Sequence, residues 1–204
     1  MNKKIIHDAL ILTAFTLVLG FILGLVYEIT KAPIAAADAA TAQAAYQKVF
    51  ADAASFEAYD DFDEEAAIAI MDEFDYNDEI EDVQVAMDNS GNALGYVITV
   101  TAKDASQANI TFSVGITNEG IVNGYSITSI AETPGLGDKA KTEEFSGQFS
   151  GKQVDSFTIV KQAPAADNEI ESISGATITS KAMANGVNAC ITYFQNVLEG
   201  GINE

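Results

Sequence analysis

The sequence predicts an α+β domain that follows a single membrane-spanning helix. Three observations support this prediction. An uncharged apolar run covers residues 9–27, near the N-terminus. Segments with strand-like alternation, separated by turn residues, fill the middle of the chain, and helical patterns dominate its last third. Strand runs followed by helices are typical of an α+β fold, here with a mainly antiparallel sheet and flanking helices.

The apolar run reads ALILTAFTLVLGFILGLVY, which is close to the 20 or so residues needed to span a bilayer core of about 30 Å. A cleaved signal peptide is the competing interpretation, with Ala35, Ala36 and Ala37 as a small-residue cleavage site. The run is longer than the usual apolar part of a signal peptide, about 7–15 residues, so we favour a retained anchor.

The charges beside the apolar run predict its orientation. Lys3 and Lys4 precede it, and positive residues favour the cytoplasmic side of a membrane. We therefore expect the cell membrane as the location, with one pass and an extracytoplasmic main domain. The predicted divisions are a cytoplasmic tail at residues 1–8, a transmembrane helix at 9–28, a tether at 29–38 and the domain at 39–204.

The composition excludes several kinds of function. The net charge is −20, from 30 acidic and 10 basic residues, whereas a nucleic-acid partner needs a basic surface. Cys190 and His7 are the only cysteine and histidine. A disulfide, an iron–sulfur cluster, a His-based triad and a Cys/His zinc site are therefore not expected, and we predict neither catalytic residues nor metal ligands. Redox chemistry would need an organic cofactor.

The expected elements follow from periodicity and turn chemistry. Residues 39–50 have helical composition, and the acid-rich residues 60–82 suggest short helices or loops. An EF-hand template places Asp61, Asp63 and Glu65 at its first ligand positions, but Ala66 stands where the loop needs glycine, so a solvated acidic face is favoured. Strands are expected at residues 83–87, 94–101, 109–117, 121–130 and 155–161, and helices at 138–149 and 177–198.

Two segments carry the candidate binding residues. The first is ETPGLGD, residues 132–138, where two glycines allow a backbone to approach a ligand closely. A plain strand-to-helix connector is the other interpretation. The second is SISGATITSK, residues 172–181, a small and hydroxyl-rich start of the last helix. A helix N-terminus attracts phosphate, although its Ser and Thr residues could equally serve as caps. The chain has no arginine, so a phosphate site would depend on backbone N–H groups, hydroxyls or lysine.

These segments resemble those of a known family. ISGATITS is similar to the covalent-flavin motif of FMN-binding domains, and ETPGLG resembles a second loop of the same family. YEITKAPIAAA, residues 27–37, resembles the segment after the membrane helix in G subunits of Rnf complexes, the ion-translocating ferredoxin:NAD oxidoreductases. The resemblance covers nearly the whole chain, and the long-spaced pair of motifs makes it specific.

The resemblance implies that FMN is attached through a phosphodiester to Thr177 by a flavin transferase that uses FAD. It further implies cofactor contacts at Ser174, Gly175, Ala176, Thr179, Ser180, Glu132, Thr133, Gly135, Leu136 and Gly137. The chain would then be a non-catalytic electron-carrier subunit among the integral and peripheral subunits of an Rnf complex. The alternatives are a C-type subunit of a sodium-pumping NADH:quinone reductase, a stand-alone anchored flavoprotein reductase, and a non-redox binding module.

Overall fold

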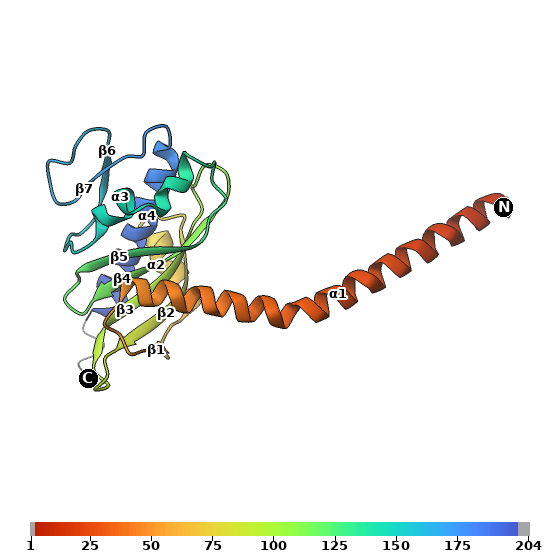
Figure 1. The fold of residues 1–204 in the computed structure, drawn as a ribbon, viewed down its shortest axis with the longest axis horizontal. Coiled ribbons are helices and arrows are strands. Elements are labelled where there is room, and N and C mark those ends of the chain that lie inside the picture. Colours follow the sequence, from red (N-terminus) through yellow and green to blue (C-terminus); the bar gives the residue numbers. More distant parts are fainter. Residues whose placement is uncertain (1–2, 200–204) are drawn as a thin grey trace. The chain divides into compact units, whose positions relative to one another are not determined.

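The computed structural model describes residues 3–199 and divides into two units, residues 1–41 and 42–204. The described part of the first unit, residues 3–41, lies within helix α1 (Lys3–Val49), which contains a stretch long and apolar enough to cross a membrane, with a mean hydropathy of 2.6 (Figure 1). The structure keeps residues 29–38 helical, where the sequence suggests a tether. Pro33 removes one helix hydrogen bond there, but the surrounding alanines favour helix strongly.

The second unit is built on a five-stranded antiparallel sheet in the order β1-β2-β3-β4-β5 (Figure 1). The predicted α+β class, with a mainly antiparallel sheet, is thereby confirmed. Four of these strands were predicted, and β1, a short edge strand, was missed. The strands are β1 (Ser55–Ala58), β2 (Glu79–Met87), β3 (Ala93–Ala102), β4 (Ile110–Thr117) and β5 (Val122–Ser129).

Helices and short segments complete the unit. The helix predicted at residues 138–149 is instead three short pieces, because Thr142 and Gly147 interrupt it. The strand predicted at 155–161 shrinks to three residues that pair in parallel with β7. These elements are α2 (Glu64–Glu73), η1 (Gly137–Lys141), α3 (Glu143–Ser146), η2 (Gly147–Phe149), β6 (Thr158–Val160), β7 (Glu169–Glu171), α4 (Thr177–Tyr193) and the π-helical η3 (Phe194–Leu198).

Asp63, one of the residues compared with the EF-hand template, caps helix α2. Its carboxylate accepts hydrogen bonds from the backbone N–H groups of Glu65 and Ala66, at 2.9 and 3.4 Å. This is the geometry of a helix N-cap. The acidic segment therefore contains a short helix, one of the forms that the sequence suggests for residues 60–82.

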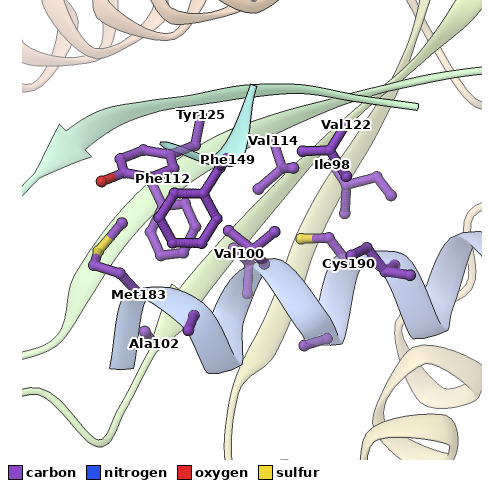
Figure 2. Packing of buried hydrophobic residues seen from close by; sticks show 14 of the residues in the cluster. Ile98, Val100, Ala102, Phe112, Val114, Val122, Tyr125, Phe149, Met183 and Cys190 are labelled. Atoms are coloured by element: carbon purple, nitrogen blue, oxygen red, sulfur yellow. The ribbon is translucent and has the colours of Figure 1, made fainter. Parts of the chain in front are cut away.

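The core lies between α4 and one face of the sheet. Strand β3 alternates so that Tyr96, Ile98 and Val100 are fully buried on this face. Figure 2 shows Met183 and Cys190 of α4 facing Val100, Val114 and Phe112. Gly186 permits the close approach, because a Cβ atom there would lie 2.6 Å from Phe112 Cζ. Because α4 is closely packed on the sheet, the position of its N-terminus relative to the sheet is fixed.

A second, smaller cluster lies among residues of the other sheet face. Tyr46, Val49 and Phe50, from the last turn of α1 and the residue after it, form this cluster with Ala86 and Val97. Gly115 lets this turn approach the sheet, since a Cβ atom there would lie 2.9 Å from Val49 Cβ. The last turns of α1, from residue 42 onward, are thus part of the second unit.

Candidate functional site

Helix α4 begins without a side-chain cap. Its N-cap residue is Ala176, and no side chain makes a capping hydrogen bond to the N–H groups of the first turn. Among the residues that the structure describes, the N–H groups of Thr177, Ile178 and Thr179 donate no hydrogen bond. Unpaired N–H groups and the helix dipole together favour an anion such as phosphate. The Ser and Thr residues of this segment do not act as caps, which was the competing interpretation.

The hydroxyl groups of this segment differ in what they bond to. Thr179 is buried and donates to Glu132 Oε2 at 3.1 Å. Ser180 is fully buried, donates to the carbonyl of Ala176 at 3.0 Å and accepts from the N–H of Ile173 at 2.9 Å. Thr177 is half-buried, and within residues 3–199 its hydroxyl has no hydrogen-bond partner. Of the three hydroxyls in the first turn of α4, only that of Thr177 is free to meet a ligand.

Glu132 joins the two predicted binding segments to each other and to a third. It is 8% exposed, and its Oε1 accepts from the backbone N–H groups of Ser106 and Gln107 at 2.8 and 3.0 Å. Its Oε2 accepts from Thr179, the residue two positions after Thr177. A Cβ atom at Gly137 would lie 2.5 Å from Glu132 Oε2, so this contact requires glycine.

These three segments enclose a cleft of about 310 Å³. Its walls include eight of the residues that were predicted to bind the cofactor, from both motifs, so residues separated by about 40 positions meet at one site. The lining comprises Ser106, Glu132, Thr133, Leu136, Gly137, Gly175, Ala176, Thr177, Ile178 and Thr179.

Three predicted residues do not line this cleft. Gly135 is exposed, and its N–H donates to Asp138 Oδ1 at 2.6 Å, which closes the turn before η1. Ser180 is turned into the protein. Ser174 instead lines a neighbouring, larger cleft of about 480 Å³, together with Lys139, Phe145 and other residues.

Two lining residues were not predicted. Ile178 is 59% exposed, and its place between two threonines at a helix start could have marked it as accessible. Ser106 comes from the loop between β3 and β4, and nothing in the sequence connects that loop to the motifs. The exposed Leu136 covers Gly175, whose φ is +79° and whose missing Cβ would lie 3.2 Å from Leu136 Cδ2. Leu136 and Ile178 thus add exposed apolar surface to the cleft.

The described side chains offer little redox or nucleophilic chemistry of their own. Cys190 is buried in the core, and burial raises the pKa of its thiol well above the usual value. The cleft itself supplies the unpaired N–H groups at the start of α4, hydroxyl groups that include that of Thr177, and apolar surface from Leu136 and Ile178. This set suits a bound phosphorylated group with a flat apolar part, because each feature has a matching surface.

Two family models match this chain. The FMN-binding domain family matches residues 106–192, a range that begins at Ser106 and includes the whole cleft, and the RnfG N-terminal region matches residues 1–49. Two solved structures of the C subunit of the Na⁺-translocating NADH-quinone reductase are similar over 55% of this chain. The one from Shewanella oneidensis has a TM-score of 0.48 at 19% identity and is covered over 57% of its length. The one from Parabacteroides distasonis has a TM-score of 0.46 at 25% identity and is covered over 60%.

Known relatives extend over the full chain. The G subunit of the Na⁺-translocating ferredoxin:NAD⁺ oxidoreductase complex of Acetobacterium woodii is 32% identical, over 96% of this chain and 94% of the relative. The G subunit of the ion-translocating oxidoreductase complex of Methanosarcina acetivorans is 26% identical, over 94% and 95% respectively. With an FMN-binding domain behind an N-terminal apolar helix, the chain belongs to the RnfG family, the G subunits of ion-translocating oxidoreductase complexes.

Proposed function

We propose that this chain is an electron-carrier subunit of a membrane-bound ferredoxin:NAD oxidoreductase complex, and that its FMN is bound covalently through phosphate to Thr177. The observation that carries the proposal is the state of the Thr177 hydroxyl. It lies at the uncapped start of α4, in the cleft, without a hydrogen-bond partner in the described chain, whereas Thr179 and Ser180 use their hydroxyls inside the protein. The names of the relatives supply the class of complex.

The covalent step would be carried out by a flavin transferase with FAD as donor. Thr177 Oγ1 forms a bond to the phosphorus of the FMN half and loses its proton, and the bond to the adenylate half breaks, so that AMP leaves. The unpaired N–H groups of the first turn of α4 would bind the phosphate oxygens. Leu136 and Ile178 would lie against the flavin ring, and the bound flavin would supply the redox chemistry that the side chains lack.

Intact mass measured on denatured protein tests the attachment. Protein made together with a flavin transferase is expected to gain the mass of one FMN less one water and to stay yellow after denaturation. Thr177→Ala is expected to lose both. Thr177→Ser, the matched control, keeps the hydroxyl and is expected to keep the label. A covalent label that persists in the alanine variant would show that the attachment site is wrong.

Membership of a complex is tested separately. A tagged chain from native membranes is expected to copurify with integral membrane subunits and with peripheral subunits that carry the ferredoxin and NAD sites. Recovery of a yellow but solitary chain would favour the stand-alone anchored flavoprotein. Copurification with the subunits of a sodium-pumping NADH:quinone reductase would favour the C-type alternative.

The anchor and its orientation belong to the same proposal. We infer that residues 9–28 span the cell membrane once, that the tail at 1–8 is cytoplasmic, and that residues 39–204 form the extracytoplasmic domain. Support comes from the apolar stretch of α1 and from Lys3 and Lys4 on its N-terminal side. A covalent bond suits this placement, because a flavin outside the cytoplasm cannot then diffuse away.

A further inference from the structure

The carboxylate of Glu132 is held by hydrogen bonds from two other segments of the chain. It accepts three of them, from the N–H groups of Ser106 and Gln107 and from the hydroxyl of Thr179. A group that accepts from three donors and is 8% exposed has little capacity left to bind a ligand. We propose that Glu132 is a positioning residue that holds the walls of the cleft, and that its charge lowers the reduction potential of the flavin.

The first half of this proposal follows from which segments Glu132 joins. Ser106 and Gln107 belong to the β3–β4 loop, Glu132 precedes the turn that carries Leu136, and Thr179 belongs to the first turn of α4. These are the segments that contribute every residue of the cleft lining. Hydrogen bonds to a charged acceptor are stronger than neutral ones, so one side chain fixes the separation of three walls.

The backbone at Gly137 lies against the Glu132 carboxylate. Gly137 passes so close that a Cβ atom would lie 2.5 Å from Glu132 Oε2 and 2.8 Å from Thr179 Oγ1. The loop therefore holds the carboxylate on one side while its other side meets the N–H donors.

The second half of the proposal rests on the proposed function, because it needs the flavin in this cleft. Glu132 lines the cleft and is nearly excluded from water, so its negative charge is weakly screened. A nearby fixed anion opposes the gain of an electron by the flavin. Replacing the charge with a neutral group of the same shape should therefore raise the flavin reduction potential.

Hydrogen–deuterium exchange on the flavin-free full chain in detergent tests the positioning role. Glu132→Gln keeps an oxygen that can accept from both N–H groups, so the amides of Ser106 and Gln107 should remain protected. Glu132→Ala removes the acceptor, and these two amides should exchange faster, while those of the central sheet stay unchanged. Unchanged protection of both amides in the alanine variant would overturn the positioning role.

Redox titration of the flavin-loaded chain tests the charge. Glu132→Gln is expected to shift the midpoint potential upward at full flavin occupancy. Glu144→Gln, the control, removes an exposed carboxylate from the neighbouring cleft and is expected to leave the potential nearly unchanged. An unchanged or lower potential in Glu132→Gln would overturn the electrostatic role. If the wild-type chain takes up no flavin, the proposed function fails and this role fails with it, while the exchange experiment still decides the positioning role.

Discussion

Asp78 is a buried carboxyl group whose titration should govern the stability of the domain between acid and neutral pH. It lies just before β2, is 6% exposed, and its Oδ1 has no hydrogen-bond partner among the described residues. Burial raises its pKa from 3.8 to about 6, with a further contribution from the nearby Asp104 and opposing ones from Lys103. We predict that the stability of Asp78→Asn relative to wild type is greater at neutral pH than at acid pH.

The sign and size of this pH effect on stability follow from the linkage between proton binding and folding. Because the folded-state pKa lies above the unfolded value, the protonated carboxyl contributes stability that is fully present below about pH 3.8 and is lost as the pH rises through about 6. The change from 3.8 to about 6 corresponds to roughly 3 kcal/mol, at about 1.36 kcal/mol for each pH unit. Solvent screening near the domain surface reduces this, and we expect about 2 kcal/mol.

The measurement is the difference in unfolding free energy between Asp78→Asn and wild type at several pH values. Any constant cost of the new amide cancels when this difference is followed from pH 4 to pH 8. Thermal unfolding by circular dichroism should show the variant gaining about 4–8 °C on wild type over that range, at about 2–4 °C per kcal/mol for a domain of this size. The control is Asp75→Asn, an exposed residue of the same segment with φ +59°, a conformation that asparagine tolerates. A difference that does not change with pH would refute the reasoning.

Two further predictions concern the cleft and the membrane. Gly175→Ala places a side chain at φ +79°, which should cost about 1–2 kcal/mol and also push Leu136 from the cleft, so that less flavin is attached. Gly151→Ala has a similar φ of +72° in open space, and equal labelling of the two variants would contradict the role of Gly175. Ser90→Cys, in an exposed turn, should react with a membrane-impermeant thiol reagent in intact cells, against a low background because Cys190 is buried. Reaction only after lysis would reverse the proposed orientation.

Most of the sheet could be predicted because its strands carry local signals. The turn at residues 88–92 is an example, since Asp88 accepts from the N–H groups of Ser90 and Asn92 within the turn itself. β1 and β7 were missed because each is three or four residues long and is defined by its partner strand. The helix at 138–149 was wrong in form, because Thr142 takes an extended conformation that periodicity does not reveal.

In the site, too, the features that could be predicted are those that depend on neighbouring residues. Helix α4 and its small, hydroxyl-rich start were predicted, since both are properties of neighbouring residues. The choice among hydroxyls came only from resemblance, whereas the structure supports Thr177 by a physical difference: Thr179 and Ser180 bond to groups that lie up to 47 residues away along the chain. Ser106 could not be predicted at all.

The sequence by itself determined the local properties of this protein: one apolar helix, an acidic domain without arginine, alternating strands, and two small-residue segments able to approach a ligand. The tertiary structure decided which of these segments meet, how the Glu132 carboxylate joins them, and which hydroxyl stays free. The physical reason is that periodicity, charge and turn chemistry act between near neighbours. A cleft, by contrast, depends on contacts such as those of Glu132 with Ser106 and Thr179, which exist only after α4 has packed on the sheet.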